Sequence, residues 1–259
     1  MAVSTQAART PLPGARPGRD PERAIKRGPR RVPAEVVAAV QRDRLFDGLV
    51  HTVTDKGYLN ARVTHICQVA GVTRPAFYAL FAGKDDAFVA TYRHGTDVLL
   101  RMMEAAYREA DTWPAGCRAA LRVLLEVLAS VPAFATMAIV EIDSVGFGAW
   151  RERDDLLRRM HQFFQEALRW SDDTPQEDLI GSVVGGIYTA VHRYVAAGRV
   201  AELPSLLPGL MYFMLAPFVG RQEAAAVAGT AEDGAVIKAP CAFPDEIESF
   251  EVFIPFSFC

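Results

Sequence analysis

The stretch GYLNARVTHICQVAGVTRPAFYALFAGK, residues 57–84, decides the fold of this 259-residue chain. It predicts two short helices joined by a tight turn. Gly71 permits the left-handed turn conformation that other residues resist. Thr73 is a good N-cap for the second helix, and Pro75 falls in the first turn of that helix, where its missing N–H costs nothing. The pattern therefore indicates a helical hairpin with a well-defined second helix.

Each helix of this hairpin has one apolar face. The inward positions are Ile66, Val69 and Ala70 around the first helix and Val72, Phe77, Leu80 and Phe81 around the second. Arg74, Tyr78 and Ala79 are then left to face outward. An exposed arginine and tyrosine beside a helix N-terminus are what phosphate and base-edge contacts need. A bare helix-turn-helix of this length is a weak signal, because any helical hairpin can imitate it.

On both sides of the hairpin, apolar residues recur mostly at helical spacing. One helix is expected from Ala34 to a stop at Gly57, and another from near Lys84 to about Ala110. Proline and glycine punctuation places later helices near 115–130, 133–145, 149–170, 176–197 and 204–218. Strand signals are missing from this region. The predicted fold class is all-α, with an N-terminal three-helix helix-turn-helix domain and a C-terminal helical domain.

The two ends of the chain differ from this pattern. Residues 1–33 hold six prolines and three glycines, so we expect a disordered arm. At the other end, apolar residues from Phe250 to Phe258 alternate at period two, as in a strand, and Pro255 limits that strand to an edge. This end either docks on the body or is poorly ordered. The predicted divisions are the arm at 1–33, the helix-turn-helix domain at 34–92, the helical domain at 93–220 and a tail of uncertain structure at 221–259.

Composition narrows the class of protein. The hydrophobic share of 51% and the charged share of 23% are ordinary for a soluble globular chain. No uninterrupted apolar run reaches the ~18 residues needed to cross a bilayer, and the first 19 residues hold no apolar signal-peptide core. We therefore expect a cytoplasmic protein with no membrane partner. Four scattered cysteines argue against a disulfide framework and a thiolate zinc site.

Charge is unevenly distributed along the chain. Residues 1–34 hold eight basic against two acidic residues, residues 35–92 hold six of each, and residues 93–259 hold fourteen basic against twenty-three acidic. A basic start ahead of an acidic body suits a polyanion partner at one end only. The arm is either a DNA contact or an inert solvated tail. Its cations are Arg9, Arg16, Arg19, Arg23, Lys26, Arg27, Arg30 and Arg31.

Residues 42 to about 92 resemble the DNA-binding domain of TetR-family (tetracycline-repressor-like) transcriptional regulators. The matching positions are Ile66, Ala70-Gly71-Val72-Thr73, Ala76-Phe77-Tyr78, Phe81 and Lys84-Asp85. The resemblance implies a homodimer that reads a palindromic double-stranded operator with its short second helix in the major groove. By position, it assigns to the DNA the residues Arg62, Thr64, Thr73, Arg74, Pro75, Ala76, Tyr78 and Lys84.

Three positions depart from the usual form of this family. Leu80 stands where a polar, phosphate-facing residue is common, and Ala76 stands where Thr or Ser is common. Arg62 replaces the usual Thr or Ser helix cap, which removes a cap worth ~1 kcal/mol but adds a possible phosphate partner. These departures predict a different operator and a larger contribution of the arm to affinity.

Residues 181–220 carry a second resemblance, to the last two long helices of many regulators of this family, which pair across a dimer as a four-helix bundle. The small side chains there permit close backbone approach. The alternative is tight packing inside one chain. The residues expected at the dimer interface are Gly181, Gly185, Gly186, Leu210 and Met214.

The helices between residues 98 and 195 are rich in large, adaptable side chains, which favour a bulky apolar or aromatic effector if they line a cavity. Such stripes are more often plain core. Glu141 and His192 lie in apolar runs, where they either orient a polar group of a ligand or face solvent. The candidate ligand-binding residues are Met103, Phe134, Met137, Glu141, Trp150, Phe164, Tyr188 and His192.

The sequence contains none of the common enzyme motifs, because its five histidines form no His-Glu-x-x-His pair and no serine sits in Gly-x-Ser-x-Gly. We expect no catalysis, no cofactor and no metal. The predicted function is a ligand-responsive repressor that binds its operator as a homodimer and is released by a small effector. Two alternatives remain: a helical small-molecule carrier whose N-terminal domain no longer binds DNA, and a ligand-blind DNA-binding protein.

Overall fold

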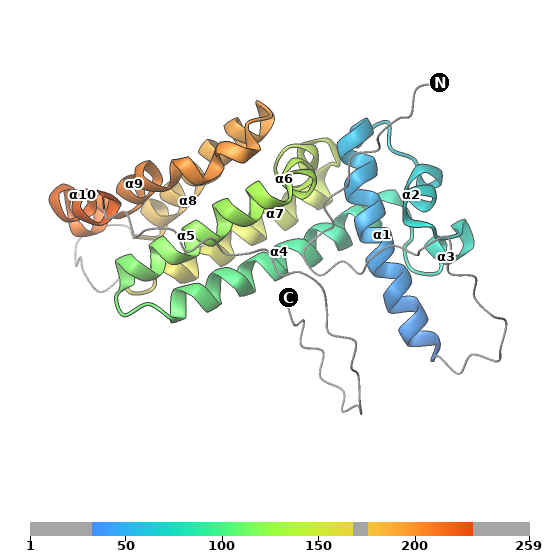
Figure 1. The fold of residues 1–259 in the computed structure, drawn as a ribbon, viewed down its shortest axis with the longest axis horizontal. Coiled ribbons are helices and arrows are strands. Elements are labelled where there is room, and N and C mark those ends of the chain that lie inside the picture. Colours follow the sequence, from blue (N-terminus) through green and yellow to red (C-terminus); the bar gives the residue numbers. More distant parts are fainter. Residues whose placement is uncertain (1–32, 168–175, 230–259) are drawn as a thin grey trace, which may run out of the picture.

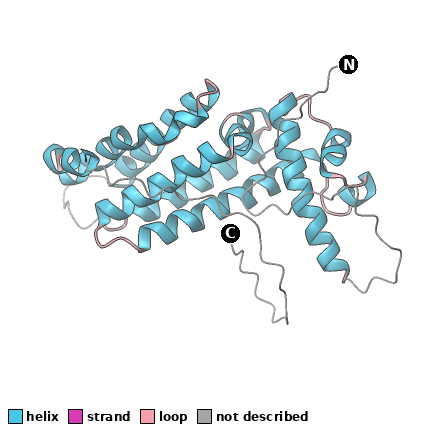
Figure 2. Ribbon diagram, in the orientation of Figure 1, coloured by secondary structure: helices cyan, strands magenta, loops and turns pink. Residues whose placement is uncertain are grey.

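The fold is known from a computed structural model, which describes residues 33–167 and 176–229. These residues form helices and loops with no strand (Figure 2), so the predicted all-α class is confirmed for them. The helices, with η marking a 3-10 helix, are α1 (Ala34–Lys56), α2 (Val63–Ala70), α3 (Arg74–Tyr78), α4 (Lys84–Arg108), α5 (Trp113–Ser130), α6 (Pro132–Ile139), η1 (Glu141–Ser144), α7 (Phe147–Arg159), η2 (Met160–Phe164), α8 (Gln176–Ala196), η4 (Val200–Leu206), α9 (Leu207–Val219) and α10 (Arg221–Gly229).

Helices α1, α2 and α3 lie together at one end of the molecule (Figure 1), and the turn between α2 and α3 follows the sequence prediction. Gly71 has a φ of 63°, and its N–H is donated to carbonyls of the last turn of α2. The Thr73 hydroxyl accepts a hydrogen bond from the Ala76 N–H at 3.4 Å, which caps α3. Phe77 is fully buried beneath this short helix.

The packing of α2 on α1 depends on a close backbone approach. A Cβ atom on Gly48 of α1 would lie only 2.8 Å from the Cβ atom of Ala70. Ile66 is fully buried in the same contact, and Cys67 is buried beside it. Val69, which the sequence pattern placed on the inward face, is 40% exposed. The buried face of α2 includes Cys67 as well as Ile66, so it is turned away from Val69, which lies at its edge.

Helix α4 is shared by both parts of the molecule. It begins beside the helix-turn-helix and runs the length of the body, where it packs along α5 (Figure 1). Helices α8 and α9 cover the other side of α5 and α7, and α10 packs on α9. The body core therefore lies between α4, α5, α7, η2, α8 and α9.

Three of the predicted helix boundaries were wrong in the body. The helix expected at 133–145 divides into α6 and η1, and the one expected at 149–170 continues α7 as the 3-10 helix η2. Gly146 separates the two regions with a φ of 112°, which a helix cannot contain. The helix expected from 204 begins at Leu207, because η4 with Pro204 precedes it.

Beyond residue 220, part of the segment predicted as a tail of uncertain structure is helical. Helix α10 occupies Arg221–Gly229 and buries Ala224 against the body. The predicted strand between Phe250 and Phe258 and the predicted disorder of residues 1–32 lie outside the described residues.

One apolar segment stands out within the described ranges. Val200–Val219, which joins η4 and α9, is apolar and long enough to span a membrane by length and composition, yet only 33% of its most apolar window is buried in the chain. Core helices of soluble proteins pass the same test, as does the bent pair formed by α5 and α6. The segment therefore presents apolar surface that a partner could cover.

Substituting Gly95 tests the crossing of α4 and α6. A Cβ atom at Gly95 would overlap the ring of Phe134, so we expect Gly95→Ala to lower the free energy of unfolding by about 1–3 kcal/mol, even though alanine favours helix. The matched control is Gly148→Ala, since a Cβ at Gly148 of α7 meets nothing within 4 Å. Urea unfolding measures the free energy of unfolding of both variants. If Gly95→Ala were as stable as Gly148→Ala, the close packing of α4 and α6 at Gly95 would be contradicted.

Candidate nucleic-acid interface and ligand cavity

Helix α3 presents its polar side to solvent. Arg74, Pro75 and Ala79 are exposed, and the Tyr78 side chain is 51% exposed. The Tyr78 ring packs edge-on against Phe77, with 5.3 Å between ring centroids. Because Phe77 is fully buried, this contact restrains the tyrosine while leaving its hydroxyl outside. The guanidinium and phenol therefore stand on the outer surface of a capped, anchored helix.

The other predicted DNA residues border this surface. Arg62 is exposed at the N-cap position of α2, where it makes no capping side-chain hydrogen bond. Thr64 is exposed in the first turn of α2, and Thr73 is exposed while its hydroxyl caps α3. Ala76 is half-buried. Their exposure is compatible with the predicted contacts, which stay a prediction.

Lys84 has a partner inside the chain. Its Nζ donates a hydrogen bond to the Tyr58 carbonyl at 2.7 Å and lies 3.9 Å from the centroid of the Tyr58 ring. The Tyr58 hydroxyl donates a short hydrogen bond to Asp85. Burial, followed by the hydrogen bond to Asp85, raises the pKa of Tyr58 above its usual range. The first turn of α4 is thereby fastened to the loop between α1 and α2, and a phosphate contact of Lys84 stays a prediction.

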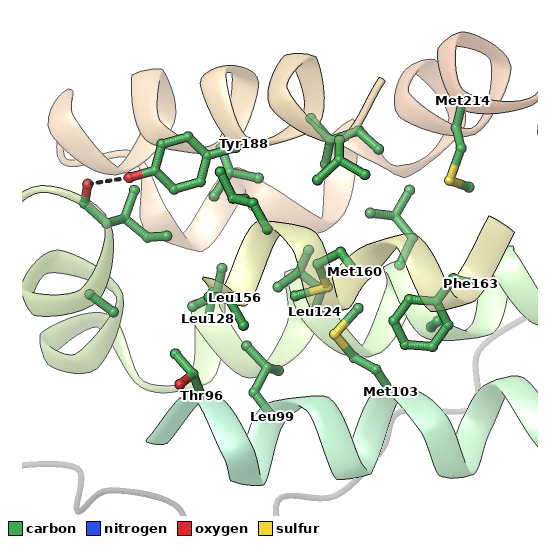
Figure 3. Close-up of a pocket in the computed structure, with 18 of the residues that line it drawn as sticks. Thr96, Leu99, Met103, Leu124, Leu128, Leu156, Met160, Phe163, Tyr188 and Met214 are labelled. Atoms are coloured by element: carbon green, nitrogen blue, oxygen red, sulfur yellow. Dashed lines mark hydrogen bonds between the residues drawn. The ribbon is translucent and has the colours of Figure 1, made fainter. Parts of the chain in front are cut away.

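A cavity lies in the body between α4, α5, α6, α7, η2 and α8 (Figure 3). Its empty space is about 840 Å³, including the part open to solvent, and the centre of a water-sized molecule can explore about 90 Å³ of it. One water needs ~10–15 Å³ by the second measure, so the space accepts something much larger than a single water. In Figure 3, Leu99 and Met103 reach into it from α4, while Tyr188 and Met214 reach in from the opposite side.

The cavity wall is apolar. The described residues that line it include no charged side chain, and the polar ones among them are Tyr92, Thr96, Cys117 and Tyr188. Thr96 donates its hydroxyl proton to the Tyr92 carbonyl at 2.8 Å, and Tyr188 donates to the Ile139 carbonyl at 3.2 Å. Burial raises the pKa of Cys117, so that thiol stays protonated. An ionised group enclosed by these apolar side chains would lose its hydration, which favours uncharged, apolar occupants.

The predicted ligand residues are divided by the structure. Met103, Phe134, Phe164 and Tyr188 line the cavity, whereas Met137, Glu141, Trp150 and His192 do not. Met137 is fully buried elsewhere and Trp150 is 46% exposed. His192 lies 3.7 Å from Asp143, and Glu141 accepts a hydrogen bond from the Tyr58 N–H at 2.6 Å. The two polar candidates therefore hold segments of the chain together.

Sequence reasoning missed the aliphatic part of the wall. These side chains carry no signal in the sequence that separates a cavity wall from solid core, because both are apolar and buried. The missed positions include Leu99, Leu121, Leu124, Leu128, Leu156 and Ile187.

The residues predicted at a dimer interface also take different positions within the chain. Leu210 and Met214 are buried inside it, and Met214 lines the cavity. A Cβ at Gly186 would lie 2.7 Å from the Phe213 ring, so Gly186 serves packing between α8 and α9. A Cβ at Gly185 meets nothing within 4 Å, and one at Gly181 approaches only His161 at 4.0 Å.

The outer side of α9 is apolar and exposed. Tyr212 and Phe213 lie three and four residues after Gly209, and Ala216 lies four and three residues after them, with Tyr212 38% and Phe213 44% exposed. Helix α9 carries no charged residue. Among the described residues, no group of three or more His, Cys, Asp and Glu side chains is arranged to hold a metal ion.

The chain is similar to known proteins in its fold and, over a limited part, in its sequence. No protein-family model matches the chain. It is 34% identical over 73 residues to the HTH-type transcriptional regulator BetI of Brucella canis, which is 28% of this chain and 37% of BetI. BetI of Brucella abortus is 33% identical over the same length. The chain thus matches little more than a third of the length of these curated relatives.

Solved structures extend the likeness to both parts of the molecule. The fatty acid degradation regulator FadR of Bacillus halodurans aligns with a TM-score of 0.60 at 16% identity, covering 67% of this chain and 96% of FadR. FadR of Bacillus subtilis, determined in complex with stearoyl-CoA, gives 0.60 at 16% identity over 68% of this chain and 97% of its own. A TetR-like regulator from Rhodococcus sp. RHA1 gives 0.51 at 18% identity, covering 70% of this chain and 96% of that one.

The chain has the fold of the TetR-like transcriptional regulators, with a helix-turn-helix followed by a helical body. The resemblance carried by residues 57–84 is thereby confirmed in fold.

A larger side chain in the cavity wall tests whether an apolar ligand binds in the cavity. Leu124 of α5 lines the cavity, and we expect Leu124→Trp to weaken binding of the apolar probe 1-dodecanol at least tenfold, since the larger ring occupies the same space. Calorimetric titration measures the affinity. Ala105→Trp, at an exposed position of α4, is the matched control and should bind as the parent does. Unchanged binding by Leu124→Trp would place the ligand elsewhere.

Proposed function

We propose that this chain is a ligand-responsive transcriptional repressor that binds a palindromic DNA operator as a homodimer. The observation that carries the proposal is the outer surface of α3, where Arg74 and Tyr78 stand exposed on a capped helix anchored by the buried Phe77. Exposed guanidinium and phenol groups on a helix of this kind suit base edges and phosphates in a major groove. The similarity to BetI supports the same function.

In this proposal the reading domain is 34–92 and the effector and dimerisation domain is 93–220. Arg62, Thr64 and Lys84 would add phosphate contacts beside α3, with Lys84 exchanging its bond to the Tyr58 carbonyl for a phosphate oxygen. The cationic arm of residues 1–33 would add sequence-independent affinity. Operator occupancy would block a promoter, and the protein would act in the cytoplasm.

Homodimerisation is supported by the outer faces of α8 and α9. The stripe of exposed Gly209, Tyr212 and Phe213 with half-buried Ala216 lacks charge, and a Cβ atom at Gly185 of α8 would meet nothing within 4 Å. A two-fold pairing of these faces would cover the aromatic rings and let two helix pairs approach closely. It would also supply the second reading helix that a palindrome requires, about one helical turn (~34–36 Å) away.

The effector of this repressor would be a molecule with a long or bulky apolar part. The wall of the cavity is uncharged, and its methionines and leucines adapt to different shapes. The complex of the Bacillus subtilis FadR with stearoyl-CoA supports an acyl chain as one candidate. Binding would favour a conformation with lower affinity for the operator, a coupling of typically ~1–3 kcal/mol.

Substitutions on α3 test DNA binding. The operator is the duplex that the purified protein enriches from random sequences. We expect Arg74→Ala and Tyr78→Ala each to weaken binding to it about 10- to 100-fold, because each removes a groove contact worth ~1–3 kcal/mol. Arg151→Ala, at an exposed arginine of α7, is the matched control and should bind as the parent does. Fluorescence anisotropy at several salt concentrations gives the affinities. If no duplex is enriched, the proposal fails and the alternative of a small-molecule carrier is favoured.

A charge placed on α9 tests the dimer. The parent chain is expected to sediment at twice its mass of 28.3 kDa. The Tyr212→Arg variant is expected to sediment as a single chain, because dimerisation would bury the unpaired cation of the new arginine in the proposed interface. Leu59→Arg is the control, since Leu59 is 76% exposed at the other end of the molecule. A Tyr212→Arg protein that remains dimeric would refute this interface.

A further inference from the structure

Helix α6 and η1 form a continuous segment between the cavity and the helix-turn-helix. On one side, Phe134, Ala138 and Ile139 belong to the cavity wall. On the other side, the Thr54 hydroxyl of α1 donates a hydrogen bond to the Ala133 carbonyl at 3.0 Å. Figure 1 shows α6 beside α1, with the body behind it. Whatever occupies the cavity therefore touches a segment that also touches the reading domain.

Glu141 joins this segment to the reading domain by its side chain. It is the first residue of η1, two positions after Ile139, and its Oε2 accepts a hydrogen bond from the Tyr58 N–H at 2.6 Å. Tyr58 follows Gly57, where α1 ends with a φ of 74°. A carboxylate from the body therefore binds the backbone of the loop that leads into α2. Hydrogen bonds to charged groups are stronger than neutral ones.

Tyr58 in turn contacts the start of α4, which follows the reading helix α3 in the chain. Its ring is buried and lies edge-on to Phe88 of α4, with centroids 5.2 Å apart. Its carbonyl accepts from Lys84 at 2.7 Å, and its hydroxyl donates to Asp85. Lys84 and Asp85 open α4 only a few residues after α3 ends. Movement of the Tyr58 backbone would therefore change the position of α2 and α3 relative to the body.

The cavity end of the segment is held by Tyr188. Its hydroxyl donates to the carbonyl of Ile139, the last residue of α6, at 3.2 Å, and its ring lines the cavity (Figure 3). A ligand that displaces this ring breaks the hydrogen bond and frees the end of α6. Glu141 is the second residue after that carbonyl.

We propose that Glu141 is a positioning residue for DNA reading: it links the Tyr188–Ile139 contact at the cavity to Tyr58, and through Tyr58 to Lys84 and Asp85. The inference rests on the proposed function for its biological meaning, since it describes how an effector would reach the DNA-binding surface. The mechanical link itself is a property of the chain and can be measured without DNA.

Amide hydrogen exchange in the full-length protein tests the link. We expect Glu141→Ala to raise the exchange rate of peptides spanning residues 57–72 at least fivefold, because the Tyr58 N–H loses its acceptor. Glu141→Gln retains a side-chain oxygen and should raise it less than twofold. Glu152→Ala is the matched control, since that carboxylate pairs with Arg93 within the body, and it should leave these peptides unchanged.

The decisive variant lies on the cavity side. Tyr188→Phe keeps the ring but removes the hydroxyl, and with it both the bond to Ile139 and the interaction with Arg153, and it should raise exchange of the same 57–72 peptides at least threefold. Because both substitutions break one chain of contacts, the double variant Tyr188→Phe with Glu141→Ala should exceed the larger single effect by less than twofold. No change in these peptides for Tyr188→Phe, or single effects that multiply, would overturn the inference.

Operator binding then separates this inference from the proposed function. Stearoyl-CoA is the probe. The factor by which it lowers the affinity of the protein for the enriched duplex should be at least threefold smaller in Glu141→Ala than in the parent chain. The affinity of the variant for stearoyl-CoA itself should stay within twofold of the parent value. If the parent chain binds no duplex, the proposed function fails while the exchange result stands. If the parent responds and Glu141→Ala responds equally, the function stands and Glu141 is not the link.

Discussion

The burial of Phe77 is the interaction on which the exposed surface of α3 depends. Helix α3 has five residues, far fewer than the ~12–15 at which an isolated helix becomes even marginal in water. Its order therefore comes from the fully buried Phe77 ring, a contribution of ~1.5–3 kcal/mol, and from the Thr73 cap. With that ring fixed in the core, Arg74 and Tyr78 are held at the solvent-exposed side of the helix.

The body contains a cavity, and empty space inside a protein lowers its stability unless the surrounding residues are well packed. Its wall residues are large, so the cavity is surrounded by close packing, as at the crossing where the Phe134 ring fills the space beside Gly95. The hydroxyls of Thr96 and Tyr188 are bonded to carbonyls of the chain, which leaves the interior uncharged. The hydroxyls of Thr96 and Tyr188 therefore do not depend on a ligand for a hydrogen bond.

Local features of this chain were predictable from the sequence, and long-range ones were not. The turn at Gly71, the cap at Thr73 and the inward Phe77 follow from residues within a few positions of one another, and the structure confirms them. The all-α class followed from periodicity. Glu141 shows the limit: its place in an apolar run indicated either a ligand contact or a solvent-facing residue, yet its partner is Tyr58, 83 positions away. No periodicity reports such a pairing.

The sequence pattern also could not show which residues of α9 face the body. Leu210 and Met214 are as apolar as Tyr212 and Phe213, so composition cannot decide which pair faces the body and which faces outward. A helix that is apolar on every side is buried on every side in a stable assembly. Within the described residues, one side of α9 packs on the body and the other stays exposed, so the proposed homodimer would account for the apolar outer side of this helix.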